Sequence, residues 1–198
     1  MNVNIHFAKP VEIYDNFLNK CAGRYCHTEV SVQLDSTLLA VIIDSCIDEA
    51  YDPKELESLL KRVKKKKGVL QFCFYILWND KVSVRFYNDM ADDNFNNYPT
   101  EDVYDTITLE IEGIETLKNF ISFYLKQINK PYDIVRALLL FSPITMRLNQ
   151  EPSRWFCSQL VMHSLKHLGM ECDRDINHMK PADVYDWLTC TIKALENN

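Results

Sequence analysis

The stretch Arg154-Trp155-Phe156-Cys157-Ser158-Gln159-Leu160-Val161 places a cysteine where an apolar, helix-forming run begins. Apolar residues recur at helical spacing as far as Leu168, and Gly169 then offers a stop. The first turn of a helix has unpaired N–H groups and the positive end of the helix dipole, so a thiol there ionises more readily. We therefore predict a buried helix that begins at Cys157 and holds a nucleophilic sulfur rigidly.

A nucleophilic thiol needs an imidazole that forms an ion pair with it or takes its proton, and His27 is the leading candidate. The segment 25–34 alternates apolar and polar residues, which predicts a strand. Its apolar face carries Val30, Val32 and Leu34, and its polar face carries His27, Glu29, Ser31 and Gln33. Spacing alone leaves a plain alternative open, in which Cys157 is a buried core cysteine and His27 a hydrated surface residue.

Composition sets the class of protein. A chain of 198 residues with 47% hydrophobic content fits one globular domain, spanning residues 1–198. The net charge of -6 argues against general binding to nucleic acid. We expect no signal peptide, and no apolar run approaches the roughly 20 residues of a membrane span. Seven scattered cysteines without an export signal indicate reduced thiols, which predicts a cytoplasmic protein.

The order of the expected elements predicts an α+β fold, with meander strands first and mostly helices later. A helical insertion at about 48–67 and a polar loop at about 89–105 interrupt it. The expected strands are 3–7, 25–34, 37–43, 69–78, 82–87 and 106–112. We expect hairpins to join 25–34 to 37–43 and 69–78 to 82–87. The expected helices are 11–20, 53–63, 115–129, 134–141, the helix that begins at Cys157, and a last one opened by Pro181.

Four short motifs resemble a known family in permuted order. Phe156-Cys157-Ser158-Gln159-Leu160-Val161 resembles the "F-C-S-E-L-V" signature of the permuted, papain-like branch of the NlpC-type cysteine hydrolases. His27-Thr28-Glu29-Val30 is similar to that family's "S-H-V-E-L" strand, Pro131-Tyr132 to its "G-x-P-Y" segment, and Pro181-Ala182-Asp183 to its "T-P-x-D" segment. The branch includes bacterial amidase-like proteins, homologues in poxviruses, other large DNA viruses and phages, and, distantly, acyltransferases related to lecithin–retinol acyltransferase. The chain departs from it where Gln159 replaces glutamate and where Asn129-Lys130 replaces the glycine before proline.

The resemblance implies a circularly permuted papain-like fold, with an antiparallel, barrel-like sheet packed against the helix of the nucleophile. It implies Cys157 as nucleophile and His27 as general base, with Glu29 as the acidic residue that orients the histidine. Tyr132 and the helix start at Ser158 would position the substrate or stabilise an oxyanion.

Two other orienters stay open. An orienter must reach the imidazole nitrogen opposite the sulfur, and Gln33 or Asp44, at the end of the following strand, could do so instead of Glu29.

Two other clusters suggest alternatives. His163 and His167 are neighbours on the Cys157 helix and Cys172 and His178 follow, which could form a zinc site; solvated histidines are the plainer interpretation, and we expect no metal and no cofactor. The lysines at 64–67 could touch phosphates or an anionic membrane, so peripheral membrane contact stays open. Such a run is more often the solvated end of a helix, where cations suit the dipole.

The sequence thus predicts a cysteine-dependent hydrolase or acyltransferase that cleaves an amide or ester through a thioester acyl-enzyme. Its substrate would be a peptide, an isopeptide or a lipid acyl group. If the protein is viral, its place would be the host cytoplasm or the virion. The alternative from another class is a catalytically silent virion, scaffold or binding protein that retains the fold.

Overall fold

The computed structural model describes residues 1–10, 24–77, 80–87, 102–141 and 153–196. The described strands and helices follow the mixed order expected from the sequence. They are β1 (Asn2–Ala8), β2 (His27–Asp35), α2 (Ser36–Cys46), η2 (Ile47–Glu49), α3 (Pro53–Val63), β3 (Val69–Tyr75), β4 (Ser83–Phe86), β5 (Tyr104–Glu110), α4 (Ile114–Gln127), α5 (Ile134–Phe141), α6 (Cys157–Leu165), η3 (Lys166–Leu168), η4 (Ile176–His178) and α7 (Pro181–Glu196). The expected α+β class is confirmed.

The five strands form one antiparallel sheet in the order β4-β3-β2-β1-β5. Val3 of β1 pairs with Val32 of β2 and with Leu109 of β5, so apolar residues of neighbouring strands share one face. In the described part of the chain, the edge strands β4 and β5 do not pair with each other. The sheet is therefore open, and the expected barrel-like sheet is wrong in that respect.

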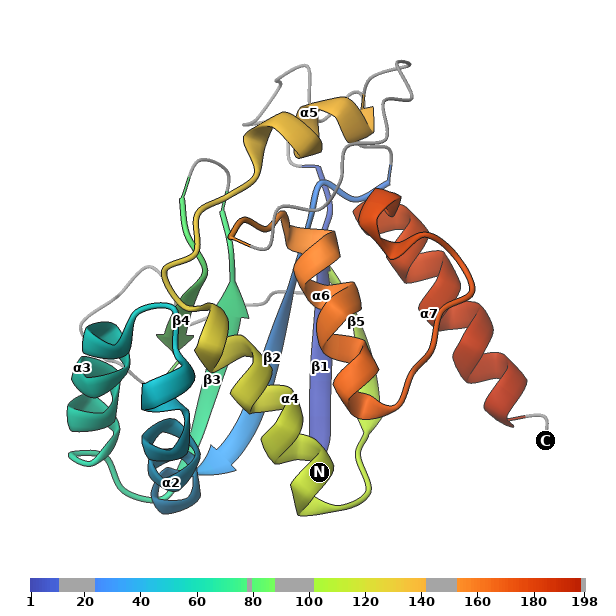
Figure 1. Cartoon of the computed structure of the whole chain (residues 1–198). Coiled ribbons are helices and arrows are strands. Elements are labelled where there is room, and N and C mark those ends of the chain that lie inside the picture. The colour runs from blue at the N-terminus through green and yellow to red at the C-terminus, as the bar shows by residue number, and fades with distance from the viewer. Residues whose placement is uncertain (11–23, 78–79, 88–101, 142–152, 197–198) are drawn as a thin grey trace.

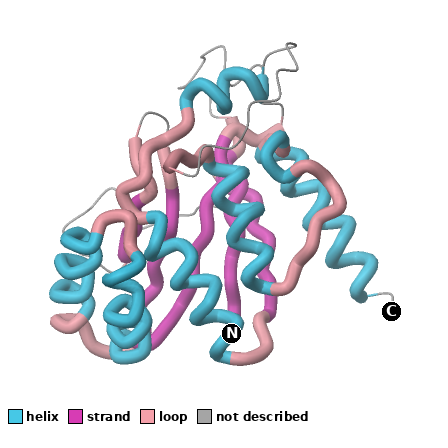
Figure 2. Tube along the Cα trace, viewed as in Figure 1, coloured by secondary structure: helices cyan, strands magenta, loops and turns pink. Residues whose placement is uncertain are grey.

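Helices lie on one face of this sheet, as Figures 1 and 2 show, with α4 and α6 crossing in front of the strands and α5 beyond one end of them. The covered face carries the alternating apolar residues, and it is fully buried at Ile5, Val30 and Phe72. The ring of Tyr124 from α4 stacks on Phe74 of β3 with centroids 4.6 Å apart. Burial of these side chains is what holds the helical layer against the sheet.

Residues 37–43 form part of a helix, so the expected strand and its hairpin with 25–34 are wrong. The Asp35 carboxylate accepts hydrogen bonds from the N–H groups of Thr37 and Leu38, at 2.8 and 3.4 Å, and so caps α2. Buried positions in α2 then recur at helical spacing, at Leu39, Ile42, Ile43 and Cys46. A short apolar run suits a strand or a buried helix equally well, and here the cap decides for the helix.

Other expectations agree with the structure within a few residues. The second expected hairpin is confirmed, since Phe72 of β3 pairs with Phe86 of β4 and Tyr75 pairs with Ser83. The expected helices at 53–63, 115–129 and 134–141 correspond to α3, α4 and α5, and η2 with α3 occupies the segment at about 48–67. The expected helix at 11–20 and most of the loop at 89–105 lie outside the described residues. Among the helices described, none has the length and apolar character needed to cross a membrane.

Candidate active site

The segment before α6 is fixed to the turn that follows α4. The Trp155 N–H donates to the Pro131 carbonyl at 3.1 Å, and the Asp133 N–H donates to the Trp155 carbonyl at 2.7 Å. The Trp155 indole N–H also donates to the side-chain oxygen of Gln127 at 3.1 Å. These bonds place the start of α6 beside Tyr132, although the two segments are more than twenty residues apart.

The first turn of α6 is held from the other side by the loop before α7. The Ser158 hydroxyl donates to the Met179 carbonyl at 2.7 Å, and the Gln159 amide donates to the Asn177 side-chain oxygen at 2.9 Å. Both Ser158 and Gln159 are fully buried. Phe156, the N-cap residue, makes no side-chain cap, so no side chain from that position competes for the N–H groups of the first turn. The helix start therefore presents backbone donors around Cys157.

The start of β2 brings His27 and Thr28 to the Cys157 sulfur. β3 pairs with β2 only between Val30 and Asp35, whereas β1 pairs with β2 as far as His27. In the described strands, this edge of β2 has no strand partner at His27–Glu29. The backbone N–H groups of Thr28 and Ser158 instead lie close enough to the Cys157 sulfur to lower the pKa of its thiol.

The electrostatics of this contact favour charge on both partners. Burial would raise the pKa of Cys157, but the hydrogen bond with His27, the charge of that imidazolium and the two backbone N–H groups lower the pKa below its ordinary value. Burial would likewise lower the pKa of His27. The neighbouring Cys157 sulfur and Glu29 carboxylate outweigh burial and raise the pKa of His27 to about 10. The pair is therefore poised as thiolate and imidazolium.

Glu29 lies beside His27 on the same face of β2. Its Oε2 is 3.4 Å from Nε2 of His27, and its side chain is only 3% exposed. Glu29 also stands opposite His6 of β1 in the strand register. His6 is bound on both ring nitrogens, by Ser31 at 2.7 Å and Thr106 at 2.9 Å. Burial lowers the pKa of His6 to about 4, against the opposing charge of Glu29, so His6 stays neutral where His27 is charged.

Tyr132 is buried next to the reactive pair. Burial first, and then the nearby charges of Cys157 and Asp133, raise its pKa well above the ordinary range. The phenol therefore keeps its proton and can act as a hydrogen-bond donor. Its own backbone N–H donates to the Asp80 carbonyl at 2.8 Å, which anchors Tyr132 in place.

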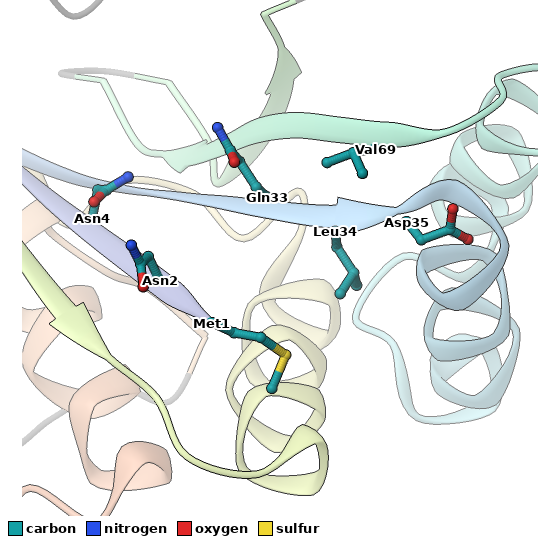
Figure 3. Close-up of a pocket in the computed structure, with 7 residues that line it drawn as sticks. All are labelled: Met1, Asn2, Asn4, Gln33, Leu34, Asp35 and Val69. Atoms are coloured by element: carbon teal, nitrogen blue, oxygen red, sulfur yellow. The ribbon is translucent and has the colours of Figure 1, made fainter.

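The two other candidate orienters lie away from His27. Gln33 is six residues further along β2, roughly 20 Å at the rise of a strand. It borders a surface pocket at the other end of the sheet together with Asn2, Asp35 and Val69, as Figure 3 shows. Asp44 is exposed on α2 and borders a different pocket with Val63 and Lys64. Only Glu29, of the three candidates, is in contact with the imidazole.

Two contributors to this site were not expected from the sequence. Thr28 acts through its backbone N–H, and no side-chain pattern reveals such a contact. His6 carried a usable signal, because it falls on the polar side of the strand whose apolar side is Val3, Ile5 and Phe7.

The residues of the zinc alternative are engaged elsewhere. His163 packs against the Trp155 ring with centroids 4.9 Å apart, and His178 pairs with Asp175 at 2.8 Å. Within the described ranges, no three histidine, cysteine or acidic side chains gather closely enough to hold a metal ion.

The arrangement supplies the parts of a thiol nucleophile: a sulfur whose pKa is lowered, an imidazole beside it whose pKa is raised, an acid beside the imidazole, and backbone donors at a helix start. Comparisons with protein-family models, with curated proteins and with solved structures found no match to this chain. The site is therefore interpreted from its own geometry.

Proposed function

We propose that this protein is a cysteine-dependent hydrolase or acyltransferase acting on an amide or ester bond. The observation that carries the proposal is the contact between Cys157 at the start of α6 and His27 at the start of β2, which lowers the pKa of the thiol and raises that of the imidazole. A thiol of ordinary pKa is only a few per cent ionised at neutral pH, so this contact accounts for most of the thiolate that can act as nucleophile.

In the first step, the Cys157 thiolate attacks the substrate carbonyl carbon and the carbonyl oxygen becomes an oxyanion. Backbone N–H groups at the start of α6, with the protonated Tyr132 phenol nearby, would stabilise that oxygen. The carbon–nitrogen or carbon–oxygen bond then breaks, and the imidazolium of His27 gives its proton to the leaving amine or alcohol. A thioester on Cys157 remains.

In the second step, neutral His27 takes a proton from water or from another acceptor, which attacks the thioester. The carbonyl carbon leaves the sulfur as a carboxylic acid or a transferred acyl group, and the thiolate–imidazolium pair is restored. Glu29, 3.4 Å from Nε2 of His27, stabilises the imidazolium and limits rotation of the ring. Its role is positioning, since it acts through the histidine.

The proposal is tested with a p-nitrophenyl ester as an acyl donor, followed by mass spectrometry of the protein. We expect a burst of nitrophenol and one acyl group on Cys157, lost in Cys157→Ser and strongly reduced in His27→Ala. Cys190→Ser is the matched control, because Cys190 is exposed on α7 and distant in sequence from the pair. Acylation of Cys157 that is unaffected by His27→Ala would refute the proposed pair.

The scaffold alternative has one observation in its favour, since Cys157 is only 6% exposed. A protein that keeps the pair but admits no substrate would leave Cys157 unmodified by the ester and by small alkylating reagents alike. That result would favour the non-catalytic alternative.

A further inference from the structure

A strongly basic segment lies at the end of the sheet opposite Cys157. The sequence 53–68 holds seven of the 22 basic residues of the chain and two of its 28 acids, a net charge of +5. Because the whole chain carries -6, the remaining residues carry -11. The protein is therefore sharply polarised, and this segment, which we call the basic turn, is its positive end.

The structure fixes where the basic turn sits. The Ser36 N–H donates to the Gly68 carbonyl at 2.9 Å, which ties the basic turn to the end of β2. His27 marks the other end of this nine-residue strand, roughly 26 Å away at the rise of a strand. Figure 1 shows α2 and α3 at the end of β2 that is opposite its entry near α6.

The lysines of the basic turn face solvent. Lys61, Lys64, Lys65 and Lys67 are exposed, and in the described part of the chain no carboxylate lies within ion-pair distance of them. Arg62 and Lys66 instead lie over the Phe86 ring, at 5.6 and 5.4 Å from its centroid. The ammonium groups on the exposed side are therefore available to an anionic surface.

Exposed aliphatic side chains flank these lysines. Val69, directly after the turn, is 64% exposed and Val41 of α2 is 59% exposed. Val41 borders the same pocket as Lys64 and Lys66, and Figure 3 shows Val69 at the sheet end beside Asp35. The carboxylates of Asp35 and Asp44 adjoin this region, but the net charge there stays positive.

We propose that the basic turn docks the protein on an anionic membrane surface, with lysines at the lipid headgroups and Val41 and Val69 at the edge of the apolar layer. Lysines beside exposed aliphatic residues are typical of peripheral membrane contacts. Single-stranded nucleic acid instead needs exposed rings for stacking, and Phe86, the aromatic residue beneath these cations, is 4% exposed. Docked this way, the Cys157 end points away from the membrane. The proposal does not depend on any catalytic activity.

The test is co-sedimentation of the full chain with phosphatidylcholine vesicles, with and without about 20% phosphatidylserine. We expect binding only to the anionic vesicles, and weaker binding as salt is raised. Lys64→Glu/Lys67→Glu should weaken it by at least about twenty-five-fold, since each lost cation costs roughly five-fold. Val69→Ser should weaken it by a smaller factor with an unchanged salt dependence.

The matched control is Lys166→Glu/Arg174→Glu, two exposed residues outside the basic turn whose reversal changes the net charge equally. It should bind as the unmodified protein does. Lys64→Ala/Lys67→Ala replaces the reversal pair if circular dichroism shows that the latter is unfolded. Absence of binding to anionic vesicles, or equal losses in the control, would overturn the proposal. Binding to single-stranded polyuridylate but not to vesicles would also overturn it, in favour of nucleic acid.

Discussion

Replacing His27 with alanine is expected to turn Cys157 from a thiolate into a buried, protonated thiol. The hydrogen bond and the charge of His27 are the largest influences that lower the pKa of Cys157, and they act against its burial. With the imidazole removed, burial is opposed by the weaker effect of the N–H groups of Thr28 and Ser158 at the helix start. The pKa of Cys157 must then rise, and the thiolate fraction at neutral pH must fall.

The size of the effect follows from the ionised fractions. An ordinary thiol with a pKa of about 8.5 is about 3% thiolate at pH 7, so a fully formed thiolate offers about thirty times more reactive sulfur. Part of this gain is lost, because thiolates of lower pKa are weaker nucleophiles with a Brønsted slope of about 0.4–0.5. We therefore expect alkylation of Cys157 at pH 7 to slow by about ten-fold in His27→Ala.

The assay measures iodoacetamide alkylation of Cys157 by peptide mass spectrometry from pH 5 to pH 10, with exposed Cys190 as internal reference. In the unmodified protein, the rate should change little between neutral pH and the pKa of His27 at about 10. In His27→Ala it should climb steeply over that range. His178→Ala is the control, because that imidazole is exposed and pairs with Asp175 instead. A steep profile in the unmodified protein, or one that His27→Ala leaves unchanged, would refute the reasoning.

Three further changes test other parts of the structure. The pKa of His6 is 6.5 in the unfolded chain and about 4 in the folded protein, so the unfolded state binds more protons below pH 6.5. The unmodified protein should therefore lose about 3 kcal/mol of unfolding free energy between pH 6.5 and pH 4. His6→Gln should abolish this loss, as measured by urea titration at each pH. Asp35→Ala should lower the unfolding free energy by about 1 kcal/mol through the lost cap of α2, and Asp35→Asn should restore most of it; equal losses in both would contradict the capping role. Ser158→Ala should cost about 1 kcal/mol of stability through its bond to Met179 without changing the alkylation profile of Cys157, because its contact with the sulfur is through the backbone.

The spacing of apolar residues was enough to predict most helices and strands. It failed where a strand and a buried helix have the same spacing. The start of α6 at Cys157 and the span of α5 agree with expectation, because apolar spacing and breaking residues both mark them. Residues 37–43 form an uninterrupted apolar run, which is compatible with a strand or a buried helix. The Asp35 carboxylate favours the helix, because it accepts hydrogen bonds from two N–H groups of the first turn. These bonds are visible only in the three-dimensional structure.

Closure of the sheet was beyond sequence reasoning for a different reason. A barrel needs its first and last strands to pair, and pairing between distant strands depends on tilt and stagger, not on alternation within a strand. The pairing of β1 with β5, more than ninety residues apart in sequence, could not be predicted from the alternation within each strand either. The permuted papain-like arrangement implied by the motifs stays a prediction, because an open five-stranded sheet with helices establishes the α+β class and not that particular fold.

The candidate site posed one geometric problem, because an orienter two residues from His27 shares its face of the strand, whereas it must reach the imidazole nitrogen opposite the sulfur. The influence of the Thr28 N–H on the pKa of Cys157 indicates that the sulfur lies at the edge of β2 that β3 leaves unpaired, and not over the polar face. β3 stops pairing at Val30, and the Cys157 sulfur takes the N–H of Thr28 that a further strand would otherwise use. A sulfur at the strand edge leaves the polar side of His27 to Glu29, so one imidazole can contact Cys157 and Glu29 together. It follows that extending β3 by two paired residues would compete with the sulfur for the N–H of Thr28 and raise the pKa of Cys157, although by less than removing His27 would.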